Sequence, residues 1–159
     1  MKRRLLALLL FIISLSALAA PNGILRLDAR APMAVTHKAV TVALEEARFW
    51  VVFEADLGAN MAGFAERWGE DLNRNALDGI RSIVVCNAWY ANQVSNADPD
   101  LLALCPLRIN LVEKDGITRV LFARPTVIAA GSPGIAVVEE IEDVIGRALR
   151  AGVAAAEGE

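Results

Sequence analysis

Two cysteines are the residues of this chain whose chemistry is easiest to place. Cys86 closes a predicted strand, and Cys105 stands just ahead of Pro106, where the next predicted strand begins. If these strands are antiparallel neighbours, the end of the first and the start of the second lie at the same edge of the sheet. The two sulfur atoms can then meet, so the sequence predicts one cysteine-bearing edge.

Three interpretations of this pair stay open: a structural disulfide, two separate core thiols, or a redox or soft-metal role. In an oxidising compartment an even pair of cysteines is most often a disulfide. Closing a loop of about 20 residues would stabilise the fold by roughly 3 kcal/mol in the chain-entropy model. No Cys-x-x-Cys motif supports a redox role, and two sulfur atoms alone do not complete a zinc site. The disulfide is the favoured interpretation.

Asn87, Trp89 and Tyr90 follow Cys86 directly. The two aromatic side chains either line a pocket beside the cysteine edge or pack the following helix onto the sheet, and packing is the more common role. The candidate binding pocket therefore consists of Cys86, Asn87, Trp89, Tyr90 and Cys105. The sequence indicates no catalytic residue and no set of metal ligands.

His37 is the only histidine, and the helical spacing of its polar neighbours predicts that it lies in water. Activation of a nucleophile needs an imidazole within hydrogen-bond reach, for which an exposed helical histidine is badly placed. Glu54 and Asp56 leave a predicted strand together and could act as an acid and a base, although carboxylates at strand ends are usually just solvated. A hydrolase or an isomerase is therefore the least favoured class.

The first residues have the layout of an export signal. Basic residues at positions 2–4 precede an apolar run, and small residues at positions 16–20 stand before Pro21. The apolar run is shorter than the roughly 20 residues that a spanning helix needs. We therefore expect residues 1–19 to be a cleaved signal peptide and residues 20–159 to be a single domain in the periplasm or outside the cell.

Charge and length limit the possible partners. Removing residues 1–19 takes away three positive charges and no negative one, so the net charge falls from −3 to −6. An acidic chain with scattered basic residues has no basic patch that could bind a phosphate backbone, so nucleic acid is a poor partner. We expect a small molecule or another envelope protein as the partner, and no stable membrane span once the signal is removed.

The pattern of apolar residues predicts alternating strands and helices. Strands are expected over 24–30, 49–53, 80–86, 107–114 and 118–123, and helices over 33–47, 60–68, 88–96 and 135–153. The segment 49–53 is dense in aromatic and β-branched residues and is predicted to be a buried strand. The order predicts an α+β fold: a single compact domain with one mixed or antiparallel sheet and helices packed on one face.

Four short motifs lie at the ends of the predicted central strands. They are Ile83-Val84-Val85-Cys86-Asn87, Asp98-Pro99, Leu104-Cys105-Pro106-Leu107-Arg108-Ile109 and Glu113-Lys114-Asp115-Gly116. Together they resemble the bacterial family catalogued as domain of unknown function 302, over residues 24–151. The resemblance implies a compact α+β domain that can form a homodimer, and it supplies no activity and no catalytic residue.

The chain departs from the pattern of this family at two positions. Ala88 stands where members usually have proline after Asn87. Cys105 precedes Pro106, whereas in members with a second cysteine it usually follows the proline. A shift of one residue turns a side chain to the other face of a strand. This departure therefore argues against the pairing of Cys86 with Cys105.

The leading hypothesis is an exported accessory domain, not an enzyme, that binds a small ligand or a protein at the cysteine edge without a cofactor. The alternative is a thiol-redox, sulfur-handling or soft-metal protein, with copper as the metal, that uses Cys86 and Cys105.

Overall fold

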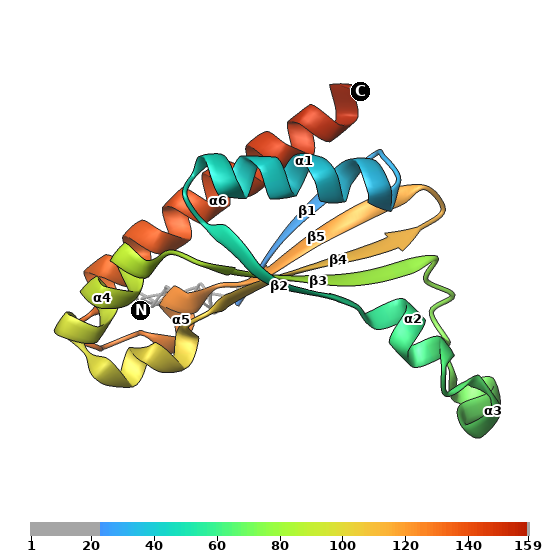
Figure 1. The fold of residues 1–159 in the computed structure, drawn as a ribbon, viewed down its shortest axis with the longest axis horizontal. Coiled ribbons are helices and arrows are strands. Elements are labelled where there is room, and N and C mark those ends of the chain that lie inside the picture. The colour runs from blue at the N-terminus through green and yellow to red at the C-terminus, as the bar shows by residue number, and fades with distance from the viewer. Residues whose placement is uncertain (1–22, 159) are drawn as a thin grey trace, which may run out of the picture.

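The computed structural model describes residues 23–158, so the predicted signal peptide at residues 1–19 lies outside the described range (Figure 1). The strands are β1 (Ile24–Ala29), β2 (Trp50–Asp56), β3 (Gly79–Cys86), β4 (Leu107–Lys114) and β5 (Ile117–Ala123). The α-helices are α1 (Met33–Glu46), α2 (Leu57–Ala62), α3 (Ala65–Trp68), α4 (Ala88–Ala97), α5 (Pro125–Ile128) and α6 (Ile135–Gly158). Two 3₁₀ helices, η1 (Gly69–Asp71) and η2 (Pro99–Leu104), complete the described chain.

The five strands form one sheet in the order β1-β5-β4-β3-β2, and every neighbouring pair is antiparallel. The central strand of this order is β4, and a hairpin that turns at Asp115 and Gly116 joins it to β5. Both residues have positive φ, 53° and 74°, as expected where a short hairpin turn matches the twist of its strands. The structure confirms the α+β class, and of the two predicted sheet types it shows the antiparallel one.

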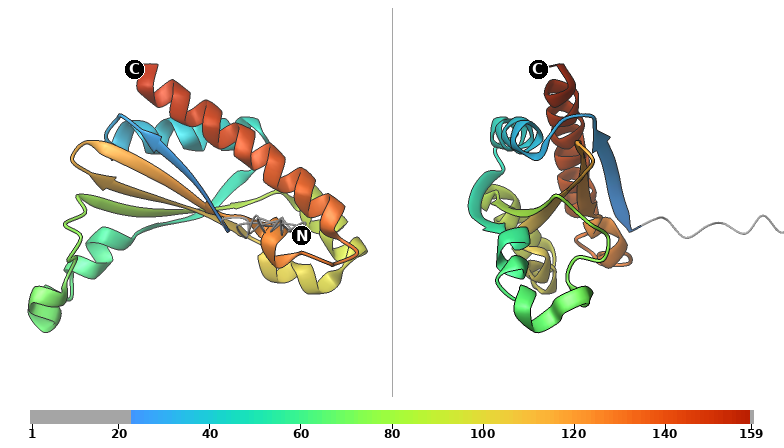
Figure 2. Two further views of the ribbon diagram at one scale, coloured as in Figure 1. Left: turned by 180° about the vertical axis from the view of Figure 1, so that it is seen from behind. Right: turned by 90° about the vertical axis from the view of Figure 1, so that its right-hand side faces the viewer.

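Helices α1 and α6 lie side by side on the same face of the sheet (Figures 1 and 2). They approach closely because α6 has a glycine at the contact: a Cβ atom on Gly152 would lie 2.7 Å from the Cα atom of Val40. The core fills the space between these helices and the sheet. Its largest fully buried side chains are Phe49, Phe122, Leu44, Ile83, Ile109, Leu111, Ile145 and Leu149.

Strand register divides the residues of the sheet between two faces. One row across all five strands faces the helices: Glu54, Ile83, Ile109, Phe122 and Leu25. The adjacent row points the opposite way: Ala55, Ser82, Asn110, Leu121 and Arg26. We call the side with the second row the open face, because in Figure 1 no described helix lies beneath the middle of the sheet.

The strand β2 differs from its prediction. The apolar segment at 49–53 was expected to be buried, but Trp50, Val52 and Phe53 are 57%, 56% and 61% exposed. The strand lies at the edge of the sheet, and an irregularity in its pairing with β3 falls between Val51 and Phe53. An apolar run does not reveal whether a strand is central or at an edge, so the burial prediction is wrong.

The segment between β2 and β3 projects from the body of the domain as an arm (Figure 1). A single helix over 60–68 was predicted. Instead, α2 begins three residues earlier, because Asp56 accepts a hydrogen bond of 2.9 Å from the Ala59 N–H and caps it. The helix ends at Ala62 with Gly63 as its C-cap, and α3 follows as a separate turn.

The C-terminal helix is longer than predicted. The sequence predicts this helix over 135–153, but α6 continues to Gly158. Ala156 is buried, and the Glu157 carboxylate accepts a hydrogen bond of 2.9 Å from the Arg30 N–H, which anchors the end of the helix. None of the helices among residues 23–158 is long and apolar enough to cross a membrane.

Candidate functional site

The two cysteines lie at one end of the sheet, where β3 ends and β4 begins. Strands β3 and β4 are antiparallel neighbours, and Val85 pairs with Leu107. Cys86 and Cys105 therefore stand on either side of this last pair and line the same small cavity. Phe49, Asn87, Tyr90, Pro106 and Ile141 also contribute to its walls.

The cavity at the cysteine edge is almost filled by its own side chains. Its volume is about 10 Å³, which is space for about one water molecule. A pocket for a small organic ligand usually offers about 300–1,000 Å³. The cysteine edge is therefore a packed cluster, and a ligand larger than water would have to open it.

Cys86 and Cys105 are both free and partly buried. Burial raises the pKa of the Cys105 thiol, and the neighbouring Cys86 raises it further. A raised pKa keeps a cysteine protonated and weakly nucleophilic at neutral pH. Cys105 is thus not an activated thiol in this state, and the disulfide between the two cysteines stays a prediction.

The residues after Cys86 mainly position α4. The Asn87 side chain accepts hydrogen bonds from the N–H groups of Trp89 (2.9 Å) and Tyr90 (3.2 Å), so Asn87 caps this helix. Trp89 is 66% exposed and is not part of the cavity wall. Of the five candidate pocket residues, Trp89 alone is not brought to the cavity, because the first turn of α4 carries it away.

Tyr90 links three parts of the domain. Its ring stacks on Phe49 with the centroids 5.6 Å apart, and its hydroxyl group donates a hydrogen bond of 2.7 Å to Glu140 on α6. Burial, followed by the hydrogen bond and the negative charge of Glu140, raises the pKa of Tyr90 to about 12. The tyrosine is therefore a neutral structural donor at physiological pH.

His37 is less exposed than predicted. Its side chain is 20% exposed, and its Nε2 atom lies 3.1 Å from the Oε1 atom of Glu54. The contact forms because Glu54 points to the helix-covered face, towards α1. Asp56 instead caps α2 and lies 3.5 Å from Arg81. Glu54 and Asp56 therefore have separate partners and do not face each other as an acid and a base.

A metal site is not evident in the described range. Among residues 23–158, no three His, Cys, Asp or Glu side chains are grouped so that they could hold a metal ion. Binding of a soft metal such as copper would rest on the two cysteines alone.

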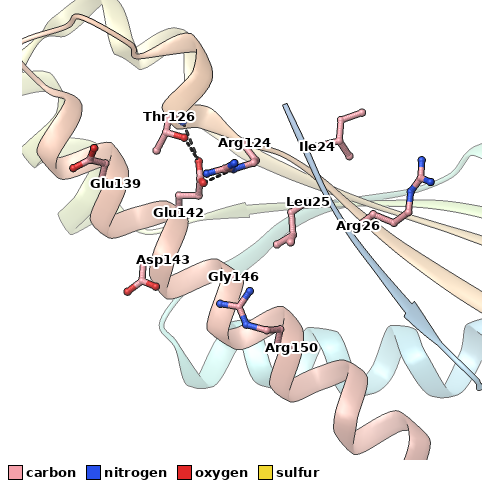
Figure 3. A pocket seen from close by; sticks show the side chains of 10 residues that line it. All are labelled: Ile24, Leu25, Arg26, Arg124, Thr126, Glu139, Glu142, Asp143, Gly146 and Arg150. Carbon is pink, nitrogen blue, oxygen red and sulfur yellow. Dashed lines mark hydrogen bonds and ion pairs between the residues drawn. The ribbon is translucent and has the colours of Figure 1, made fainter. Parts of the chain in front are cut away.

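A larger polar groove lies between the edge strand β1 and the helix α6 (Figure 3). Its volume is about 660 Å³. Its walls carry three basic and three acidic side chains: Arg26, Arg124, Arg150, Glu139, Glu142 and Asp143. The sequence analysis missed this groove, because its residues come from three distant segments and no motif links them.

Glu142 is the best-anchored charge in the groove. Its carboxylate accepts hydrogen bonds from Arg124 Nε (2.6 Å), Thr126 Oγ1 (2.6 Å) and Thr126 N (3.1 Å). Burial alone would raise its pKa, but the bonds from Thr126 and Arg124 outweigh burial and lower the pKa. The three contacts join the β5–α5 connection to the middle of α6.

The open face of the sheet mixes apolar and basic side chains. Phe53 and Val84 lie side by side in one row with Arg108, and Leu121 lies beside Arg26 in the next. The charged residues of the face are Arg26, Asp28, Arg108, Lys114 and Arg119, of which Asp28 is paired with Arg119 at 2.7 Å. The face thus carries a net charge of +3 (four basic residues and one acidic) on a chain that is acidic as a whole.

The fold and the site define a class: a small α+β domain with a one-sided antiparallel sheet, a packed cysteine edge and an uncovered apolar and basic face. The sequence model of the family described as Domain of unknown function DUF302 matches residues 26–152. The chain belongs to this family.

One solved structure with the same fold is that of an uncharacterized conserved DUF302 protein from Bacillus stearothermophilus. The two chains superpose with a TM-score of 0.70 and are 17% identical, over 80% of this chain and 96% of the other. At this identity the similarity establishes the fold alone. Among curated proteins, none matches the chain.

Proposed function

We propose that this protein is an exported binding domain, not an enzyme, that attaches to another protein through the open face of its sheet. The observation that carries the proposal is this uncovered face. A one-sided antiparallel sheet normally presents polar side chains to water. Here Phe53 is 61% exposed, and Val84 and Leu121 are only partly buried.

The composition of the open face favours a protein partner. Contiguous apolar surface with charged residues around it is typical of interaction sites. Arg26 and Arg108 make no ion pair with any of the residues 23–158, so both guanidinium groups are available to a partner's carboxylates. We infer that the partner presents an acidic and apolar surface, because electrostatic complementarity directs association.

The cysteine edge has a different role in this proposal. Its cavity of about 10 Å³ does not accommodate a ligand, so a small molecule bound there, as first expected, is less favoured than a protein bound at the sheet. Export would place the two thiols in an oxidising compartment. A disulfide bond between them would covalently link the end of β3 to the segment just before β4.

A charge placed on the open face tests the proposal. Phe53→Asp puts a carboxylate among the exposed apolar side chains without touching the core, so the variant should fold. We expect the mature wild-type protein to run in envelope extracts at a mass above that of its monomer, and the variant to run as a monomer. Val42→Asp, at an exposed apolar residue of α1 away from the open face, is the control and should behave as wild type.

The mass of the complex also identifies the partner. A mass of two chains that persists in the purified protein would show that the open face binds a second copy, which is the homodimer that the family resemblance implies. Any other mass would indicate a different envelope protein. If wild type and Phe53→Asp both run as monomers in the extract, the proposal is wrong.

A thiol-redox function is the second candidate, because both cysteines line one cavity and Cys86 affects the pKa of Cys105. It would require rapid reaction of native thiols with a thiol reagent. We expect the opposite: in the exported protein both thiols should appear only after denaturation and reduction. Fast native reaction, or a visible chromophore from bound copper, would favour the redox or soft-metal alternative.

A further inference from the structure

Two glycines in the interior of α6, Gly146 and Gly152, differ in which atoms lie beside them. A glycine inside a helix costs about 0.5–1 kcal/mol relative to alanine. Gly152 has a packing reason, since a Cβ atom there would lie 2.7 Å from the Cα atom of Val40. Gly146 has no backbone neighbour of this kind. The nearest atoms to a Cβ there belong to the guanidinium group of Arg150, with Nη2 at 3.4 Å and Nη1 at 3.6 Å.

The glycine at position 146 therefore affects Arg150 and not the helix packing. With no side chain on Gly146, the guanidinium group can lie across the surface of α6, at the floor of the groove beside β1. Figure 3 shows the Arg150 side chain turned back along the helix towards Gly146, with Leu25 pointing from β1 into the same space.

Arg150 also differs from the neighbouring arginines in its ion pairs. Arg124 binds Glu142, and Arg147 binds Asp143 one turn along the helix. Within the described part of the chain, no ion pair or hydrogen bond engages the guanidinium group of Arg150. The five N–H donors of this exposed side chain are thus free to bind a ligand in the groove.

The charges at this end of the groove select an anion. Arg124 and Arg150 contribute two positive charges, and Glu142 contributes one negative charge that Arg124 and Thr126 already satisfy. Asp143 also lines the groove, but it is paired with Arg147, so this pair adds no net charge. The net charge of +1 suits a single carboxylate, which an arginine can bind through two parallel hydrogen bonds. The unpaired Glu139 lies 11 residues from Arg150, about 16 Å along the helix axis, so it does not oppose an anion bound at Arg150.

We propose that the groove between β1 and α6 binds the carboxylate of a small organic acid. Arg150 holds the carboxylate, Gly146 provides the floor, and Leu25 contacts the aliphatic part of the ligand. The volume of about 660 Å³ is within the range of ligand pockets. The groove adjoins the open face at Arg26, but the proposed ligand contacts at Arg150, Gly146 and Leu25 are not on that face. The site goes beyond the protein-binding function.

Titration of the mature, isotope-labelled protein followed by amide NMR tests the site. The probe is butyrate, which has one carboxylate and a short apolar body. We expect saturable shifts of the amide signals of Leu25 and Gly146. Arg150→Gln should weaken binding at least about tenfold, or roughly 1.4 kcal/mol. Arg67→Gln, which removes an arginine on α3 that does not line the groove, should bind as wild type.

Two further ligands identify the chemistry that the groove selects. Butylammonium has the same apolar body with the opposite charge and should not bind. Inorganic phosphate should bind more weakly, because it lacks the apolar part that contacts Leu25. Equal affinity for phosphate would overturn the assignment to an organic carboxylate, and so would binding of butylammonium at these residues.

The variant Gly146→Ala tests whether butyrate binding can be weakened without a loss of protein stability. The added methyl group removes the cost of a helical glycine, contacts the Arg150 guanidinium group and occupies space at the floor of the groove. We expect this variant to be at least as stable as wild type and yet to bind butyrate more weakly. Absence of saturable shifts in wild type, or equal losses in Arg150→Gln and Arg67→Gln, would show that the groove is not a carboxylate site.

Discussion

Tyr90 is held by two contacts that favour its neutral form. The ring is covered by Phe49, and the hydroxyl group donates to the Glu140 carboxylate at 2.7 Å. Because Tyr90 is the only tyrosine, its ionisation can be followed by the ultraviolet absorbance of the phenolate. We expect a midpoint near the pKa of about 12, well above the ordinary value of about 10.

The sign of the corresponding effect on stability follows from the raised pKa. The contribution of Tyr90 is fully present below the pKa of the unfolded chain and is lost as pH rises towards 12. Glu140→Gln removes the negative charge next to the phenol, so the midpoint should move down towards the ordinary value. An unshifted midpoint in the folded wild-type protein would contradict the contact between Tyr90 and Glu140.

Glu142 shows the opposite linkage to pH. Its folded pKa is lowered, so its contribution to stability is present above the ordinary glutamate value of about 4.3 and is lost as pH falls through the folded pKa. We expect Glu142→Gln to lower the free energy of unfolding by about 1–3 kcal/mol at neutral pH. Urea denaturation should show this difference shrinking in acid.

A matched control for Glu142 lies on the same helix. Glu139 lines the same groove but has no partner among the described residues, so Glu139→Gln should change stability by less than about 0.5 kcal/mol. If the two variants lose the same stability, or if the loss in Glu142→Gln does not depend on pH, the contacts of Glu142 with Arg124 and Thr126 are not stabilising.

At the scale of residues, the sequence indicated which side chains lie together and not what they do. The spacing of Cys86 and Cys105 suggested that both lie at one edge, and they line one cavity. The direction of Trp89 and the pairing of His37 with Glu54 were not accessible from the sequence. Both depend on which residue begins a helix and on which face a neighbouring strand presents.

At the scale of elements, the contact between α1 and α6 depends on Gly152. Gly152→Ala would place a methyl group 2.7 Å from the Cα atom of Val40, so a backbone must move. We expect a loss of about 1–3 kcal/mol in the free energy of unfolding, as is usual for overpacked cores. Thermal and urea denaturation should both show it.

Gly146→Ala is the natural comparison, because both variants add one methyl group to the same helix. Only Gly152→Ala should destabilise the protein, since position 146 faces a flexible side chain and not a backbone. A Gly152→Ala variant that is as stable as wild type would contradict the close packing of α1 on α6.

The elements with a strong pattern were predicted well. The range of β4 was predicted without error, and α1, α4 and β3 differ from their predictions by one residue at an end. The misses have local causes. Asp56 moved the start of α2, and the last turns of α6 are held by Arg30 and Glu157, which are far apart in sequence. The short α5 after Arg124 has too few residues to give a periodic signal.

At the scale of the whole molecule, the positions of the open face and of the groove depend on the strand order, which the sequence did not reveal. The open face exists because α1 and α6 cover the same side of the sheet, and neither connection length nor composition determines that. The same topology brings β1 next to α6 and so creates the groove with Arg150. Both proposed surfaces are consequences of packing that becomes visible only once the five strands are in order.

The central claim is that the open face is covered by a protein in the cell envelope. A photo-crosslinking residue placed at position 53, on this face, tests the claim in intact cells, and position 139, on the exposed side of α6, serves as the control. We predict a crosslinked product of one discrete mass from position 53 and none from position 139. No product from position 53, or the same products from both positions, would contradict the account.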